Sequence, residues 1–212
     1  MSRRLVNITL DNLSDLPTRC RNCVYWELDP GAAQRAADNG GAALEKEAWV
    51  SDALLEWGCC GQLVYVDGVP AGYVMYAPPA YVPRSIAFPT SPVSPDAVLL
   101  MTGRIVAEFA GSGLGRMLLQ GLARDVVRRG IRAVEAFGRT TDGAPTPATR
   151  GADYRCLLPA GYLRAVGFKT IRQHPLTPRM RLDVKSTATW REDVEYAIEK
   201  LLGSMQSPVL SR

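Results

Sequence analysis

The chain has 212 residues, a length that suits one domain with its own core and leaves room for a terminal extension. Apolar residues make up 47% of the sequence and charged residues 22%, as in an ordinary globular protein. The 25 basic and 21 acidic side chains give a net charge of +4, too small and too scattered to indicate nucleic-acid binding. No apolar run reaches the roughly 18–20 residues of a membrane span. We therefore expect neither a nucleic acid nor a membrane as partner.

The N-terminus has the basic start of a signal peptide but not its apolar continuation. Asn7, Asp11 and Asn12 interrupt the apolar stretch that should follow Arg3 and Arg4. We therefore expect a cytoplasmic protein without a targeting segment.

The five cysteines are an odd number, which argues against a secreted disulfide framework and favours buried thiols. Cys20 and Cys23 form a C-x-x-C pair, and Cys59 and Cys60 are adjacent. Zinc binding and a redox pair are the alternatives to buried thiols, although adjacent cysteines suit one zinc ion poorly. We expect no metal.

The first third of the chain predicts a strand, two helices and a hairpin. Residues 4–10 form the strand, residues 13–28 a helix stopped by Asp29-Pro30-Gly31, and residues 42–57 a helix closed by Gly58. Residues 62–66 and 71–76 are strands, and the Asp67-Gly68 pair between them is a good hairpin turn.

The rest of the chain alternates strands and helices. Residues 98–106 form a nearly continuous apolar run, which indicates a central strand buried on both faces. In the predicted helix 113–129, apolar side chains recur every four residues and make one packed face. They are Leu114, Leu118, Leu122 and Val126. Residues 133–137, 169–173 and 179–184 are predicted strands, and residues 159–166 a short helix.

A capping box, Thr189 to Glu192, begins a last predicted helix with an apolar stripe. We expect this helix to pack on the domain or on a second subunit, which leaves a homodimer open. The predicted organisation is a domain over residues 1–185 and a C-terminal helix and tail over residues 186–212.

The most informative segment runs from Ile105 to Arg116, where the central strand meets three alternating glycines and a helix start. Glycines allow a ligand to approach the backbone, and the N–H groups of a helix N-terminus bind anions. The segment therefore predicts a phosphate cradle. It lacks the Gly-Lys-Ser/Thr end of a P-loop. A dinucleotide fingerprint that began at Gly111 would need its third glycine where Arg116 stands.

The segment Ala110-Gly-Ser-Gly-Leu-Gly115 resembles the acyl-CoA-binding motif R/Q-x-x-G-x-G/A of GNAT acetyltransferases, with Ala110 in place of Arg or Gln. The predicted short helix that leads into Gly167-Phe168 is also similar to that family, as is the order of elements over residues 3–184. The resemblance implies an α/β domain with a mixed, mostly antiparallel sheet flanked by helices. It also implies acetyl-CoA as cosubstrate and an amine that attacks the thioester directly.

The resemblance also implies positions for the cosubstrate. The backbone of Ile105 and Val106 would meet the pantetheine arm, and the cradle would bind the pyrophosphate. The cradle residues are Gly111, Ser112, Gly113, Leu114, Gly115 and Arg116.

The acid and the base are less clearly marked. Many relatives have a tyrosine where this chain has Leu163, so Tyr162, one residue earlier, is the expected proton donor, with Tyr154 as another candidate. Glu27 lies where the family builds its acceptor site and is the expected general base. Glu135 and His174 are weaker candidates for the base.

The sequence does not name the acceptor amine, a small molecule or a peptide. We expect aromatic acceptor walls from the first two helices and residues 78–95, where Arg84 would attract a carboxylate. Such walls favour apolar or carboxylated amines over polycations. A catalytically silent acyl-CoA sensor is the alternative function, and a thiol-redox protein is a third.

Overall fold

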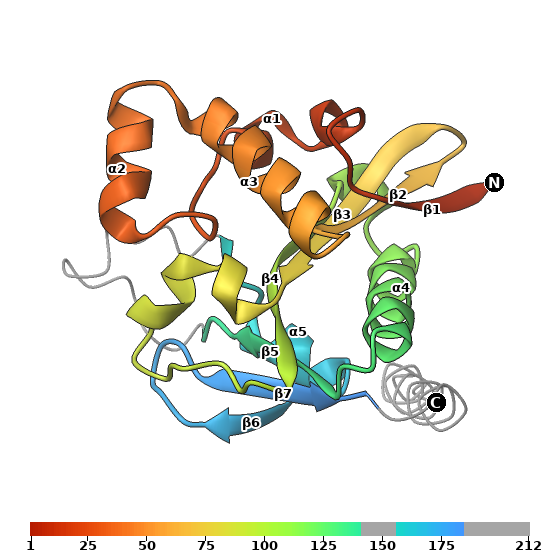
Figure 1. Ribbon diagram of the computed structural model, residues 1–212. Coiled ribbons are helices and arrows are strands. Elements are labelled where there is room, and N and C mark those ends of the chain that lie inside the picture. The colour runs from red at the N-terminus through yellow and green to blue at the C-terminus, as the bar shows by residue number, and fades with distance from the viewer. Residues whose placement is uncertain (141–155, 185–212) are drawn as a thin grey trace, which may run out of the picture.

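The computed structural model describes residues 1–140 and 156–184, and within them seven strands form one open sheet (Figure 1). The strand order is β1-β2-β3-β4-β5-β7-β6, and only the pair β4/β5 is parallel. The strands are β1 (Arg3–Asn7), β2 (Gly61–Val66), β3 (Val69–Ala77), β4 (Ala97–Ile105), β5 (Ala133–Phe137), β6 (Lys169–Arg172) and β7 (Arg179–Asp183). The expected α/β fold with a mixed, mostly antiparallel sheet is confirmed. Tyr154 and the predicted helix from Thr189 lie outside the described residues.

Helices cover both faces of the sheet, and Figure 1 shows α3 and α4 on opposite sides of it. The helices are α1 (Thr18–Arg21), α2 (Pro30–Asp38), α3 (Ala42–Glu56), α4 (Leu114–Arg128) and α5 (Ala160–Ala165). One core joins α3 to β3 through Trp49 and Tyr73, and the other joins α4 and α5 to the opposite face through Leu118 and Leu163. Within the described ranges, no helix is long and apolar enough to cross a membrane.

The predicted helix over residues 13–28 is wrong. This stretch holds only a short 3-10 turn, Leu13–Asp15, and the four-residue α1. Pro17 causes the break, because a proline disfavours helical backbone in the residue before it, and Leu16 is extended with a ψ of 145°. Asp29 does not end a helix but begins α2: its carboxylate accepts the N–H groups of Gly31 and Ala32 at 2.9 and 3.0 Å.

The hairpin and the predicted central helix are confirmed. Asp67 and Gly68 connect β2 to β3 with positive φ angles of 49° and 84°, as a tight hairpin turn requires. The four apolar side chains predicted to share one face of α4 are all buried.

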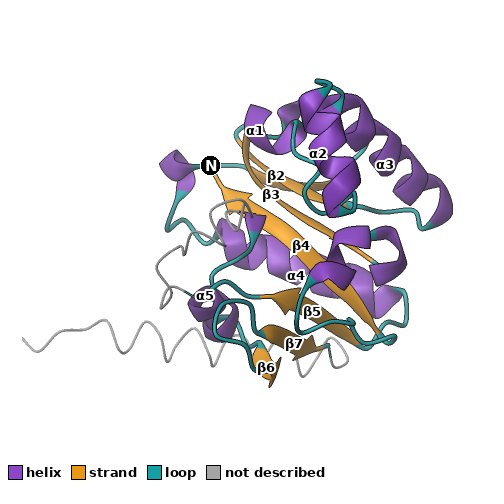
Figure 2. Ribbon diagram, turned by 90° about the vertical axis from the view of Figure 1, so that its left-hand side faces the viewer, coloured by secondary structure: helices purple, strands orange, loops and turns teal. Residues whose placement is uncertain are grey.

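β4 and β5 diverge, which opens the sheet at its centre. They pair over only three residues each, from Ala97 opposite Ala133 to Leu99 opposite Glu135. Beyond Leu99, β4 keeps β3 on one side, while in the described chain no strand pairs with its other edge. Figure 2 shows the two strands together at one end and separate at the other.

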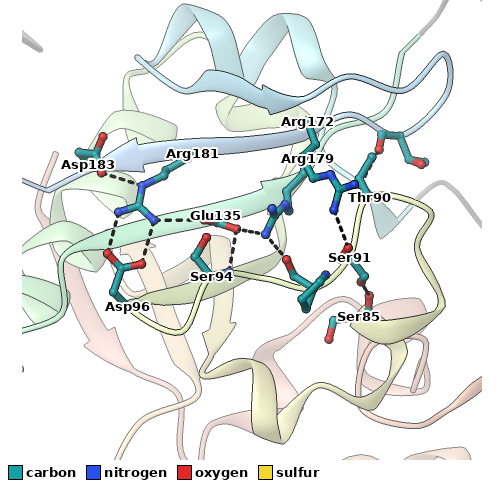
Figure 3. A network of polar contacts seen from close by, with 12 residues as sticks. Ser85, Thr90, Ser91, Ser94, Asp96, Glu135, Arg172, Arg179, Arg181 and Asp183 are labelled. Carbon is teal, nitrogen blue, oxygen red and sulfur yellow. Dashed lines mark hydrogen bonds and ion pairs between the residues drawn. The ribbon is translucent and has the colours of Figure 1, made fainter.

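An ion network around the buried carboxylate of Glu135 holds the closed end of this opening (Figure 3). Arg181 on β7 donates to both carboxylate oxygens of Asp96 at 3.0 and 2.9 Å and to Glu135 at 3.2 Å. Arg179 donates to the other oxygen of Glu135 at 2.9 Å, and the N–H of Ser94 donates to the same oxygen at 3.2 Å. Glu135, a weaker candidate for the base, thus fastens the start of β4 to β5 and β7.

Candidate functional site

A cavity of about 440 Å³ lies where β4 and β5 separate. Its floor is one face of β3 and β4, because Tyr73 lies opposite Arg104 and Met75 opposite Thr102, and alternate residues of a strand share a face. The register between β3 and β4 shifts at Met101, so this stretch of β4 contains a bulge. The cavity therefore combines strand side chains with an unpaired strand edge.

The wall opposite β4 comes from the chain after β5. Arg139 exchanges two backbone hydrogen bonds of 2.8 Å, one to the carbonyl of Leu158 and one from the N–H of Ala160. The close approach depends on Gly138, since a Cβ there would lie 3.0 Å from the Cβ and 3.2 Å from the Cα of Ala160. Residues 156–159 and Arg139 thereby line the cavity.

The third wall contains a buried ion pair, Glu27 with Lys46 of α3. Their side chains are 1% and 3% exposed, and the Lys46 ammonium donates to one carboxylate oxygen of Glu27. The backbone N–H of Trp26 donates a hydrogen bond to the other carboxylate oxygen of Glu27 at 3.2 Å. The expected base therefore lines the cavity, held by Lys46, for which the sequence carries no signal.

The cavity also presents polar groups that are suited to an anion. Trp26 is 2% exposed, lines the cavity, and its indole N–H has no hydrogen-bond partner among the described residues. Arg19, Arg104 and Arg139 line the same cavity, and the Nε–H of Arg139 is buried without a partner in the described part of the chain. A buried donor without an acceptor is costly, so a ligand oxygen at this place would be favourable.

The predicted cradle lies at the start of α4. Gly111 and Gly113 have left-handed φ angles of 75° and 80°, and a Cβ on either would meet nothing within 4 Å. Within the described residues, no side-chain hydrogen bond caps the start of α4 at Gly113. The first N–H groups of a helix have no intrahelical partner, so this open end of α4 can bind an anion.

The edge of β4 leads from the cavity towards this cradle. The backbone N–H of Val106 donates a hydrogen bond to the carbonyl of Ala71 in β3 at 2.9 Å, so it faces the β3 edge of the strand. Since successive strand residues direct their backbone groups to opposite edges, those of Gly103 and Ile105 face the edge that β5 leaves open. Of the two predicted pantetheine residues, Ile105 is thus the one with a backbone suited to the task.

The structure separates Tyr162 from Glu27. Tyr162 is not among the described residues that line the cavity; its hydroxyl lies 3.0 Å from the position of a Cβ on Gly115, in the first turn of α4. Burial raises its pKa, so the phenol stays protonated at neutral pH. Leu163, at the position of the family tyrosine, is fully buried in the core.

A second tyrosine, Tyr73, does line the cavity, and burial raises its pKa strongly. The sequence gives no sign of this position, because the strand pattern marks Tyr73 as a core residue. The alternation of Tyr73 with Met75 along the strand indicates only that both side chains are buried.

His174 accepts the N–H groups of Leu176 and Thr177 at 3.2 and 3.0 Å, and so holds a turn away from the cavity.

The expected aromatic walls are present only in part. Trp26 lines the cavity, but Trp49 and Phe88 belong to the core, and of the described residues in 78–95 none is in the lining. Arg84 lies over the ring of Tyr25 at 4.4 Å.

The cysteines form a different group from the pairs that the sequence suggests. Cys20, Cys23 and Cys156 line the cavity, and the Sγ atoms of Cys23 and Cys156 are 3.6 Å apart. Cys59 and Cys60 are buried elsewhere, and all five are thiols. Among residues 1–140 and 156–184, no cluster of three or more His, Cys, Asp or Glu side chains is placed to hold a metal ion.

Comparison with known proteins identifies the fold. No protein-family model matches the chain, and no curated protein matches it by sequence. Its structure is similar to that of PaiA N-acetyltransferase from Thermoplasma acidophilum in complex with coenzyme A, with a TM-score of 0.54, 10% identity, and coverage of 86% of this chain and 99% of that one.

The structure is also similar to that of a putative acetyltransferase of the GNAT family from Desulfovibrio desulfuricans. The TM-score is 0.51 at 17% identity, and the aligned part covers 87% of this chain and 100% of that one. Ard1 from Thermoplasma volcanium gives 0.50 at 12% identity, with 88% and 100% covered. The chain therefore has the fold of GNAT acetyltransferases.

Proposed function

We propose that this protein is an acetyl-CoA-dependent N-acetyltransferase whose acceptor amine binds in the cavity between β4 and β5. The observation that carries the proposal is the continuity of three features: the cavity, the open edge of β4 beside Gly103 and Ile105, and the uncapped start of α4. An extended pantetheine arm fits an unpaired strand edge, and a pyrophosphate fits a helix N-terminus. Neighbours with this fold include one in complex with coenzyme A, which supports the same cosubstrate.

Cosubstrate binding is assigned to the residues that the family motif marks. The backbone of Ile105 and Val106 would contact pantetheine. The N–H of Ile105 would donate to it, whereas the N–H of Val106 already donates to Ala71. The turn from Gly111 to Arg116 would hold the pyrophosphate. Its members are Gly111, Ser112, Gly113, Leu114, Gly115 and Arg116.

Glu27 is proposed as the general base. It lines the cavity, and Lys46 fixes its carboxylate by a buried ion pair. The amine nitrogen attacks the thioester carbonyl, the new C–N bond forms and the C–S bond breaks. Glu27 accepts the proton that the attacking nitrogen loses as the amide forms, Tyr162 donates a proton to the departing thiolate, and proton exchange with water returns both groups to their starting states. Tyr162 is assigned this role from the family resemblance alone; its hydroxyl lies beside the cradle, so Tyr73, which lines the cavity, is the alternative donor.

The acceptor is proposed to be an amine with a carboxylate, such as an amino acid or a peptide terminus. The lining holds Arg19, Arg104 and Arg139 and the unpartnered N–H of Trp26, whereas the charge of Glu27 is already paired with Lys46. Guanidinium groups bind carboxylates through charge-assisted hydrogen bonds. A polyamine would place further positive charge among these cations.

A matched set of acceptors tests this proposal. Phenylalanine and phenethylamine differ only in the carboxylate, and spermidine is the polycation. CoA release and product mass are measured for each at equal concentration with acetyl-CoA. The proposal predicts the fastest transfer to phenylalanine and the slowest to spermidine. A preference for spermidine would overturn the acceptor class, and acetyl-CoA binding without transfer to any amine would favour the silent sensor.

A further inference from the structure

Two cysteines that are 133 positions apart in the sequence meet across the cavity. Cys23 lies on the wall that holds Glu27, and Cys156 begins the wall that continues to Pro159. Their sulfur atoms are 3.6 Å apart, and both side chains are partly exposed. Cys20 lines the same cavity, but the contact of Cys23 is with Cys156.

We propose that Cys23 and Cys156 are a site of reversible modification by small disulfides, which convert the pair into a disulfide that links the two walls of the cavity. The oxidant is a small-molecule disulfide such as glutathione disulfide. The first product is a mixed disulfide at one cysteine, and the second is the intramolecular bond. The inference that oxidation blocks the acceptor rests on the proposed function, whereas the formation of the bond does not.

The electronic environment makes Cys23 the first to react. The hydrogen bond with Cys156 lowers the pKa of Cys23 to about 7, although burial acts in the opposite direction. A backbone hydrogen bond with Tyr25 and the ammonium of Lys46 also lower this pKa, and the charge of Glu27 raises it. For Cys60, by contrast, burial outweighs the ammonium of Lys46 and raises the pKa to about 12. Near neutral pH, Cys23 therefore has a substantial thiolate fraction, and the thiolate is the form that attacks disulfides.

The chemistry balances without a further reactant. The Cys23 thiolate attacks one sulfur of glutathione disulfide and releases one glutathione thiolate. Cys156 then loses its proton and attacks the sulfur of Cys23, which releases the second glutathione thiolate. Two protein thiols are oxidised and one glutathione disulfide is reduced to two thiols, which take up the released protons.

The bond would narrow the cavity between the wall that holds Glu27 and the wall of residues 156–159. A disulfide brings two sulfur atoms to about 2.05 Å, closer than the present contact, and fixes both side chains. Cys23 is four residues from Glu27 and belongs to the same wall. Oxidation therefore ties the wall that carries the proposed base to the wall opposite.

The test uses the full chain, glutathione disulfide and peptide mapping by mass spectrometry after alkylation. Wild type and the matched control Cys20→Ser should yield a peptide pair that joins Cys23 to Cys156. Cys156→Ser should stop at a glutathione adduct on Cys23, and Cys23→Ser should form no bond at Cys156 in the same time. The reaction rate should rise through pH 7. A bond between Cys20 and Cys23, or no protein disulfide, would overturn the proposal.

The effect on the site is measured separately. For each variant, the rate of acetyl transfer after oxidation is divided by the rate of the same variant before oxidation. Wild type and Cys20→Ser should lose most of their activity and regain it with dithiothreitol. If the mapped bond forms and transfer continues at the same rate, the blocking role is wrong. If no variant transfers acetyl groups before oxidation, the proposed function fails while the mapping still decides on the bond.

Discussion

Gly113 and Gly130 lie at opposite ends of α4 with nearly the same left-handed backbone, at φ angles of 80° and 70°. A Cβ on either would meet nothing within 4 Å. The same substitution therefore causes a similar backbone strain at both, about 1–2 kcal/mol. Only Gly113 belongs to the proposed cradle, so the pair separates loss of binding from loss of stability.

Gly113→Glu should abolish binding of CoA, because its carboxylate would lie where the pyrophosphate binds. Gly130→Glu should lower the melting temperature by a similar amount and leave CoA affinity unchanged. Titration calorimetry of the two variants and wild type measures both affinities. Unchanged affinity in Gly113→Glu would show that the start of α4 is not the cradle.

Glu27→Gln should lower kcat by roughly 10²–10⁴-fold through loss of the base. It should also destabilise the protein by about 3–5 kcal/mol, because it leaves the Lys46 ammonium buried without its partner. The double variant Glu27→Gln with Lys46→Met removes both charges and should regain most of the stability. Its activity should stay low. If transfer returned with stability in the double variant, Glu27 would be a structural residue and not the base.

Tyr162→Phe should reduce kcat for transfer and leave the KM for the amine nearly unchanged, because the hydroxyl lies by α4 and not in the acceptor cavity. Tyr73→Phe is the matched variant, since it removes the one tyrosine hydroxyl of the cavity lining within the described chain. Initial rates at saturating and low amine distinguish the two. A loss of kcat confined to Tyr73→Phe would transfer the role of proton donor to Tyr73.

The sequence was most informative where local chemistry decides the structure. Asp67-Gly68 predicts its hairpin, and the four-residue spacing of Leu114 and Leu118 predicts α4 and its buried face. The glycine pattern predicts the cradle because its strand and its helix are contiguous in sequence. These features need no knowledge of distant contacts.

Features that depend on distant contacts, or on competing local signals, were not predicted. Lys46 was overlooked because the partner that explains its burial, Glu27, is on another element. The contact between Cys23 and Cys156 joins segments with no local signal between them. Asp29-Pro30 suits both the end of one helix and the start of the next, and the side-chain cap of α2 decides for the second.

Asp96 should make stability depend on pH in the acid range (Figure 3). Its hydrogen bonds with Arg181 hold the pKa of Asp96 below its usual 3.8. Because the folded-state pKa is the lower one, the contribution is present above about pH 4 and is lost as the pH falls through the folded value.

Asp96→Asn should therefore melt at a lower temperature than wild type at pH 6, and the difference should shrink towards pH 2. Asp183→Asn is the control, because that side chain is 63% exposed and its pair with the same arginine contributes little. A difference between wild type and Asp96→Asn that stays constant from pH 6 to pH 2 would contradict the assignment.

The central claim is that the chain transfers an acetyl group from acetyl-CoA to an amine. The most direct measurement supplies acetyl-CoA with an isotope-labelled acetyl group and phenylalanine, and follows the mass of the product together with CoA release. The account predicts labelled N-acetylphenylalanine in a one-to-one ratio with CoA released above the rate of hydrolysis, and none with Gly113→Glu. Tight binding of acetyl-CoA with no labelled product from phenylalanine or from any other amine, including peptides, would contradict it.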